Sequence, residues 1–370
     1  MELRKVLCLM LLILILPVAS VKAEDADSIP VYGFKYKSTN WVKQLIENGF
    51  RINDPEVNYP KFPRFLLKVY NWGDRTFNSY DIAYVVGTGK NWKLTGKNYN
   101  WIESYALFFT NHTNIRMISN PYSDFGAHLG FMALSVGYTF KVNELFGNPK
   151  STRSHYEYGF TCSRLAANVV YTKTSGGVKV TKFGDMELPH SFKFNGVTQK
   201  TFSLDAYYFF NNRKYSQAAA YCYSKYQLKS AGSLIAGINY GTQNISLDFT
   251  KLPLEMLDRL PGDYSHYNFH YTEYNLTLGY AYNLVLHPKR WLMNVTALPS
   301  IGYKHSYEDS TDGKKDMFAT TAKVMLGAVF NHRNLFVAMN GRFDGHLHFG
   351  NGYTFFNSIE SLTVDVGLRF

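Results

Sequence analysis

The last nine residues of the chain alternate strictly between two kinds of side chain. Side chains of a β-strand point alternately to its two faces, so the segment predicts a strand with one apolar and one polar face. Such a strand suits a barrel that has lipid outside and a polar lumen inside. We expect barrel-assembly machinery to recognise the apolar face and the terminal aromatic residue as an insertion signal. The apolar face consists of Leu362, Val364, Val366, Leu368 and Phe370, and the polar face of Thr363, Asp365, Gly367 and Arg369.

The beginning of the sequence predicts export. Arg4 and Lys5 precede an apolar run, Val6–Ala19, which is followed by small or apolar residues, so residues 1–23 are expected to be a signal peptide. This run of 14 residues is shorter than the ~20 that a spanning helix needs. Removing the peptide lowers the formal net charge from +11 to +9. For an exported chain, this charge favours anionic lipid headgroups or sugar phosphates over nucleic acid.

The composition excludes two common classes of protein. Aromatic residues make up 17% of the chain, with 29 Tyr and 28 Phe, while the mean hydropathy is slightly negative at -0.22. A helical membrane protein would be far more apolar, and an ordinary soluble domain would hold fewer aromatic residues. Tyr and Trp suit the headgroup level of a bilayer, where the ring is half buried and its polar edge is hydrated.

Alternating strands recur from Phe77 onward. The clearest sets Leu276, Leu278, Tyr280, Tyr282 and Leu284 against Asn275, Thr277, Gly279, Ala281 and Asn283. Unpaired peptide groups in hydrocarbon cost several kcal/mol each, so the sheet must close on itself. We predict an all-β transmembrane antiparallel barrel of about twelve strands, within a range of 10–14. The fourteen candidate strands are 78–87, 104–110, 124–131, 133–141, 155–163, 165–173, 199–210, 214–225, 231–240, 270–286, 291–305, 318–331, 334–348 and 358–370.

The predicted domains are the signal peptide (1–23), an N-terminal periplasmic segment (24–76) and the barrel (77–370). The N-terminal segment contains a short helix around 40–47, and three prolines then predict a loop. An alternative interpretation places this segment inside the lumen as a plug. Extracellular loops are expected at 142–153, 174–198 and 247–268, and tight periplasmic turns at 211–213 and 331–333. Pro299 predicts a bulge or bend in its strand.

A secreted soluble β-sandwich is the rival to the barrel, because its strands also alternate. In a sandwich, however, the polar strand faces meet water and should carry many charges. Here they consist mainly of Gly, Ala, Ser, Thr and Asn. The pattern therefore favours the barrel.

Polar residues gather on the inward face of several predicted strands. In one interpretation they form a constriction that filters solutes by charge. In the other they are a structural network of ion pairs that fills a narrow lumen, where each charge needs a partner. The predicted lumen cluster comprises Glu273, Asn275, Lys304, Lys323, Asn340, Arg342, Asp344, His346, His348, Asp365 and Arg369.

Two kinds of chemistry are alternatives to a purely structural role for the polar residues. His346 and His348 lie about 7 Å apart on one strand face beside Asp344, but this is a weak zinc pattern, so we expect no metal and no cofactor. A lipid hydrolase would need a serine within hydrogen-bond reach of a base. The weak candidates are Ser230 and Ser233 as nucleophile and His270 and His305 as base. Cys162 and Cys222 either pair or serve as small strand residues.

Several stretches resemble a family of predicted outer-membrane barrels, known only as a domain of unknown function, from Bacteroides-type Gram-negative bacteria. They include Tyr70–Asp81, Tyr84–Trp92, Tyr207–Asn212, Tyr215–Tyr221, Lys229–Ser233, Leu298–Tyr303 and Asp344–His346. The resemblance covers essentially the whole mature chain. It implies an outer-membrane location and a barrel architecture, and it implies no activity.

We therefore expect a non-enzymatic envelope component, either a narrow channel or a structural barrel with a polar lumen. One alternative is a lipid- or lipopolysaccharide-modifying hydrolase. Another is a partner in an envelope assembly, which would act through residues 24–76. Outer-membrane lipid and lipopolysaccharide are the expected surroundings in every case.

Overall fold

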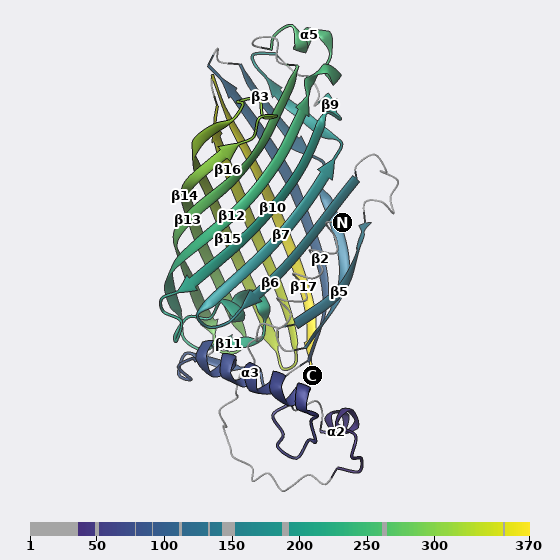
Figure 1. Cartoon of the computed structure of the whole chain (residues 1–370), viewed down its shortest axis with the longest axis vertical. Coiled ribbons are helices and arrows are strands. Elements are labelled where there is room, and N and C mark those ends of the chain that lie inside the picture. The colour runs from purple at the N-terminus through teal and green to yellow at the C-terminus, as the bar shows by residue number, and fades with distance from the viewer. Residues whose placement is uncertain are drawn as a thin grey trace.

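The computed structural model describes residues 36–48, 52–77, 79–90, 92–110, 113–131, 134–142, 152–186, 192–260, 265–350 and 352–370. The predicted signal peptide lies outside these residues. Within them, fifteen antiparallel strands form one sheet that curves around the long axis of the molecule (Figure 1). No helix in this described part is long and apolar enough to cross a membrane.

Twelve strands form the barrel wall. The C-terminal strand, β17, pairs along its whole length with β2, which is the first wall strand in the order of the chain. The predicted all-β antiparallel barrel of about twelve strands is thereby confirmed. In spatial order the wall runs β6 (Thr152–Thr161), β7 (Leu165–Ser175), β10 (Val197–Phe209), β12 (Ala231–Asp248), β13 (His266–His287), β14 (Trp291–Ser306), β15 (Lys315–His332), β16 (Leu335–Phe349), β17 (Tyr353–Arg369), β2 (Trp92–Phe109), β4 (Tyr122–Phe131) and β5 (Leu134–Lys141).

The two ends of this path, β5 and β6, are not joined by a strand pairing among the described residues. Aromatic side chains join β6 to β2 instead. The ring of Tyr99 on β2 stacks on His155 of β6 with centroids 5.0 Å apart, and Trp101 lies 5.6 Å from the same imidazole. Aromatic packing therefore brings β6 against β2 across the barrel interior.

The apolar face of the long strands changes sides part-way along the barrel. On β13, the residues from Tyr274 to Leu284 that face outward are apolar and exposed, and their inward neighbours are polar or small. Nearer the start of the same strand, Tyr267, Phe269 and Tyr271 face inward and are buried. The strand therefore has an apolar exterior along one part and an ordinary apolar interior along the other.

The apolar interior forms a core at the barrel end away from the C-terminus (Figure 1). Short strands β3 (Asn114–Ser119), β8 (Val178–Phe183) and β9 (Phe192–Phe194) extend the sheet there, and η2 (Phe249–Lys251) and α5 (Leu254–Leu257) lie within a connecting loop (Figure 1). Their buried side chains pack with those of the wall strands, such as Phe269 and Phe355, whose rings stack 4.0 Å apart. The predicted loops 174–198 and 247–268 therefore contain regular elements that cap this end.

The opposite end of the lumen is occupied by residues 210–230, which we call the plug. It contains the π-helix η1 (Ala218–Cys222) and β11 (Lys225–Gln227), which pairs with β1 (Val85–Gly87). The predicted strands 214–225 and 78–87 are therefore wrong as wall strands, because the regular pairing in these segments joins them to each other. Apolar plug residues, including Tyr223, pack against inward-facing side chains of the wall, including Phe336.

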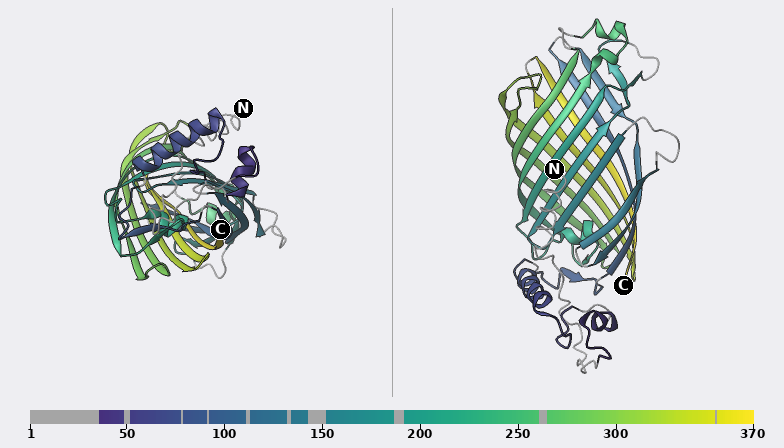
Figure 2. Two further views of the ribbon diagram at one scale, coloured as in Figure 1. Left: turned by 90° about the horizontal axis from the view of Figure 1, so that it is seen from below. Right: turned by 45° about the vertical axis from the view of Figure 1, so that its right-hand side comes forward.

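The N-terminal segment contains two helices. In α2 (Trp41–Glu47), the Asn40 side chain caps the first turn by accepting a hydrogen bond of 2.9 Å from the Val42 N–H. A second helix, α3 (Lys61–Phe77), replaces the predicted loop. Its proline, Pro63, lies in the first turn, where no intrahelical N–H bond is lost. Figure 2 shows these helices at the same end as the C-terminus and outside the barrel, so this segment is not the plug.

Pro299 lies in β14 without the predicted bulge at its own position. Its pairing with β15 is regular, with Ala322 opposite. On the other side, the ladder to β13 skips from the Thr277–Ser300 pair to the Tyr280–Ala297 pair. Because proline has no N–H to donate, the structure leaves a gap in one ladder instead of inserting a residue.

Candidate functional site

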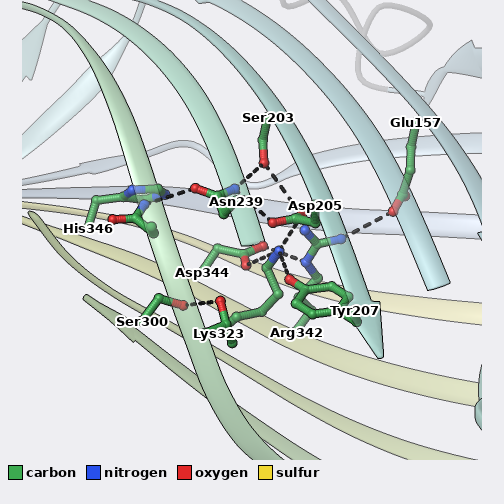
Figure 3. Close-up of polar contacts among 12 residues, drawn as sticks. Glu157, Ser203, Asp205, Tyr207, Asn239, Ser300, Lys323, Arg342, Asp344 and His346 are labelled. Atoms are coloured by element: carbon green, nitrogen blue, oxygen red, sulfur yellow. Dashed lines mark hydrogen bonds and ion pairs between the residues drawn. The ribbon is translucent and has the colours of Figure 1, made fainter. Parts of the chain in front are cut away.

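A chain of ion pairs crosses the middle of the lumen (Figure 3). The Lys323 ammonium lies 2.7 Å from Asp205 Oδ2 and 3.8 Å from Asp344 Oδ1. The other oxygen of Asp344 accepts a bond of 2.5 Å from Arg342 Nε, and Arg342 Nη1 lies 3.2 Å from Glu157 Oε1. Two cations and three carboxylates thus alternate in space. We call these five residues the central ion-pair chain.

The central chain joins opposite sides of the barrel. Lys323 is on β15 and Asp205 is on β10, and β12, β13 and β14 lie between them in the wall. The Asp205 side chain is only 2% exposed, and Asn239 Nδ2 donates a bond of 2.8 Å to its second oxygen. Tyr207 accepts a bond of 3.2 Å from Lys323. These partners satisfy the buried charges and hold the two sides of the barrel together.

A second group of charges lies on β13, β14 and β16 of the wall. Glu273 Oε2 is 3.7 Å from Lys304 Nζ, and Glu273 Oε1 is 3.3 Å from His346 Nδ1. Lys304 is fully buried, and its ammonium lies 3.9 Å from the centre of the Tyr271 ring, which adds a cation–π contact. Asn275 donates a bond of 2.9 Å to Asn239, which connects this group to the central chain.

The two charged residues of the C-terminal strand face the plug. Tyr223 donates a bond of 2.6 Å from its hydroxyl to Asp365 Oδ2, and Arg369 Nε donates one of 2.8 Å to the Tyr223 carbonyl oxygen. Asn340 also donates to the Tyr223 hydroxyl. Burial and the adjacent Asp365 carboxylate raise the pKa of the Tyr223 phenol, so it stays protonated and can donate. Asp365, Arg369 and Asn340 therefore hold the plug through Tyr223.

The two histidines of β16 have different partners. His346 faces Glu273, whereas His348 Nε2 lies 2.7 Å from Asp312 Oδ2, which also accepts a bond of 2.7 Å from Tyr353. Among the residues that the structure describes, no three His, Cys, Asp or Glu side chains come close enough to hold a metal ion.

The weak hydrolase candidates are far apart. Ser233 accepts a bond from one backbone N–H and donates to one backbone carbonyl, and Ser230 accepts a bond from a backbone N–H of β13. His270 is paired with Asn244, eleven residues along β12 from Ser233, which corresponds to about 36 Å. His305 lies opposite Thr272, at a similar height to His270. The structure therefore forms no serine–histidine pair from these residues.

Cys162 and Cys222, in the part of the chain that the structure describes, are free thiols. Cys162 is buried at the turn between β6 and β7, where its sulfur accepts a hydrogen bond of 3.2 Å from the Leu165 N–H. Cys222 lies in the π-helix of the plug. It is therefore not a strand residue, as one interpretation of the sequence had it.

Two small chambers adjoin the central chain. The larger has a volume of about 90 Å³ and is lined by polar side chains that include Asp205, Lys323, Glu273 and His346. The smaller has a volume of about 30 Å³, and Arg342 and Asp344 of β16 line both chambers. A chamber of the larger size holds a few water molecules. The middle of the lumen is therefore polar and constricted.

Two charges of the central chain were missed by the sequence reasoning. Asp205 is flanked by small and apolar residues in a predicted strand, and Glu157 lies between Tyr156 and Tyr158. A single carboxylate in an aromatic, alternating strand is a usable signal, because it cannot face lipid without cost. The partners across the lumen have no sequence signal, since strands far apart in the chain supply them.

The sequence was then compared with known proteins. A family model described as a domain of unknown function (DUF4421) matches residues 79–370. The chain belongs to this family. A comparison with curated proteins found no match.

Solved structures with a similar arrangement of strands include several outer-membrane proteins. A bacterial polysaccharide outer membrane secretin has 9% identity and a TM-score of 0.31, with 76% of this chain and 99% of that chain covered. OmpT of Vibrio cholerae has 9% identity and a TM-score of 0.26, covering 75% and 98%. The P. putida toluene transporter TodX has 8% identity and a TM-score of 0.24, covering 76% and 90%. At these TM-scores the likenesses carry no argument about this chain.

Proposed function

We propose that this DUF4421 chain is an integral outer-membrane β-barrel that serves as a non-enzymatic envelope component, with a closed lumen in the conformation described. The observation that carries the proposal is the filling of the lumen at three levels. The apolar core occupies one end, the central ion-pair chain crosses the middle, and the plug occupies the other end. A general diffusion pore needs a continuous aqueous path, which these layers interrupt.

The outer surface supports the membrane placement. On β13, exposed apolar and aromatic residues run from Tyr274 to Leu286, a distance of twelve residues. At about 3.3 Å per residue and a tilt of about 40°, this band is about 30 Å tall. Aromatic residues mark both of its edges on the adjacent strands, with Tyr303 at one edge and Trp291, whose ring lies 4.6 Å from Phe330, at the other. A band of this height with aromatic girdles is typical of a barrel in an outer membrane.

Conductance in planar lipid bilayers tests the closed lumen. We expect the wild-type protein to give no stable conductance steps, and a variant with residues 215–226 replaced by a short Gly-Ser linker to stay silent as well, because the apolar core and the central ion-pair chain still interrupt the lumen. Deletion of residues 36–48, which removes a similar length of chain outside the barrel, should leave the protein silent. Stable steps from the wild-type protein at low voltage would contradict the proposal.

Three narrower points remain predictions. Origin in a Bacteroides-type Gram-negative bacterium, export through residues 1–23 and recognition of Phe370 by assembly machinery all come from the sequence. The envelope-assembly alternative predicts partners that co-purify with the full chain and are lost when residues 24–76 are removed. The hydrolase alternative has no support in the positions of Ser230 and Ser233.

A further inference from the structure

Helix α3 exposes an aromatic face at the barrel end that holds both the plug and the C-terminus. Phe62, Phe65 and Trp72 are 69%, 58% and 61% exposed. At 3.6 residues per turn these three side chains fall within an arc of about 80° on one side of the helix. Large aromatic side chains gathered on one exposed helix face indicate a contact surface, because a soluble helix normally turns such a face inward.

The other side of α3 already has a partner within the chain. Leu67 packs against a small core that contains Leu45, Val57 and Tyr59. Leu67 lies roughly opposite the aromatic face on a helical wheel. The N-terminal segment therefore fixes one side of α3, and the exposed aromatic residues lie on the other side.

The charge of α3 selects one class of occupant. The helix contains four basic residues and one acidic residue, and the basic side chains of Lys61, Arg64 and Lys68 are exposed. An amphipathic helix with Phe and Trp on one face and Lys and Arg on its flanks is typical of helices that lie in a bilayer interface. Basic residues there are attracted to anionic headgroups.

The barrel presents the same charge at this end. The turns and the plug that are described there carry Arg164, Arg213, Lys229, Lys289, Arg290 and Arg333, whereas one acidic residue, Asp81, lies in the turn between α3 and β1. In Figure 1, α3 runs across the barrel axis just beyond these turns, and the view from below in Figure 2 places it along the rim of the barrel. A helix in this position lies roughly parallel to a membrane that surrounds the barrel.

The segment between α3 and the barrel is also anchored to the plug. The Asp81 N–H donates a bond of 2.8 Å to the Arg213 carbonyl oxygen, and Lys225 lies 4.8 Å from the centre of the Tyr80 ring. The pairing of β1 with β11 continues this attachment. The position of α3 is thus linked to the plug by a short connection.

We propose that α3 is an interfacial helix that inserts its aromatic face among anionic phospholipids of the periplasmic leaflet. The inference rests on the outer-membrane placement proposed above. It adds a second site of membrane contact, which lies outside the barrel wall. Because the connection after α3 is bound to the plug, the lipid contact also fixes the base of the plug relative to the bilayer.

Quenching of tryptophan fluorescence by brominated lipid tests the proposal with the full-length mature protein in vesicles. The Trp72 signal is the difference between the wild-type protein and Trp72→Phe. In vesicles of phosphatidylethanolamine and phosphatidylglycerol brominated near the headgroup end of the acyl chains, we expect quenching and a blue shift of this signal. Both effects should weaken in vesicles of phosphatidylcholine alone and at high salt.

Two double variants separate the aromatic face from exposed apolar residues in general. Phe62→Ser with Phe65→Ser should abolish the quenching of Trp72. The matched control is Val42→Ser with Ile46→Ser on α2, whose side chains are 43% and 58% exposed and whose helix has one basic and one acidic residue. This control should leave the quenching unchanged.

Trp291 separates failure of this proposal from failure of the membrane placement. It lies on the outer wall and is 46% exposed, so its signal, obtained with Trp291→Phe, should be quenched in any vesicle that contains the barrel. Quenching of Trp291 without quenching of Trp72 would overturn the α3 proposal alone. A Trp72 signal that is shielded from both lipid and water would also overturn it, in favour of a second copy or a protein partner. Absence of quenching at Trp291 would overturn the membrane placement first.

Discussion

Removal of the lysine from the central ion-pair chain should destabilise the barrel strongly. Lys323→Met keeps most of the side-chain volume but leaves Asp205, 2% exposed, without its cation. It also removes the ammonium that lies 3.8 Å from Asp344. Breaking a buried pair by removing one partner typically costs about 3–5 kcal/mol, because the remaining charge stays desolvated. We expect a loss of about this size in the free energy of unfolding.

A double-mutant cycle isolates the pair from the volume change. Asp205→Asn with Lys323→Met removes both charges, so the double variant should be more stable than Lys323→Met alone, with a coupling energy of about 2 kcal/mol. Unfolding by urea of protein folded into phospholipid vesicles, followed by tryptophan fluorescence, gives the free energies. Asp316→Asn is the control, because its pair with His305 is on the outer surface, and it should give no measurable change.

One result would refute this reasoning. If Lys323→Met unfolds within about 1 kcal/mol of the wild-type protein and the cycle shows no coupling, the charges must be hydrated as freely as surface charges are. The middle of the lumen would then be open to water. That result would also contradict the closed lumen proposed above.

Two further predictions concern the barrel wall. Deletion of Phe370 should impair membrane insertion, because it removes the two backbone hydrogen bonds with Trp92 at the end of the β17–β2 pairing. Asp365→Asn should loosen the plug and leave insertion unchanged. Fractionation of cells measures the amount of each variant in the membrane, and normal insertion of the protein without Phe370 would contradict the prediction. Gly302→Ala should destabilise the folded barrel by about 1–3 kcal/mol, because a Cβ there would lie 1.9 Å from the Tyr274 carbonyl oxygen. In the control Gly341→Ala, the added Cβ meets no atom within 4 Å and should be tolerated. Equal urea midpoints of unfolding for the two variants would contradict the packing argument.

Strands that meet lipid on one face were the easiest to predict. On β15 and β16, and on β13 from Tyr274 onward, the apolar residues keep one phase, so the outward and inward sets follow from period-2 alternation alone. The first half of β2 was missed because Asn98 and Asn100 interrupt its outward apolar face. The second half of β12, residues 241–248, was not predicted as strand for another reason. Ile245 and Leu247 are apolar on the inward face, so the phase changes where the strand enters the apolar core.

The plug was mistaken for a strand because its tyrosines resemble those of the wall. Tyr215, Tyr221 and Tyr223 are buried or half-buried in the structure, and each is hydrogen-bonded inside the lumen. A strand faces one environment on each side, whereas the π-helical turn packs into the lumen on nearly every side. Local pattern does not distinguish these two ways of burying an aromatic residue.

The sequence alone determined the class of the molecule. A period-2 pattern with an apolar and a polar face is a local property, because each residue's face follows from its position in the strand. It predicted the barrel, the inward set from Glu273 to Arg369 and the outward face that ends at Phe370. It also predicted that the inward faces carry polar and charged residues, each of which needs a hydrogen-bond or ion-pair partner inside the lumen.

Only the tertiary structure decided which partners meet. Asp205 and Lys323 are 118 residues apart, and the curvature of twelve strands brings them within 2.7 Å. The insertion of residues 210–230 into the lumen is likewise a matter of available space, which exists only once the wall has curved around it. Pairing across a lumen depends on strand register summed over several neighbours, and no local pattern encodes that sum.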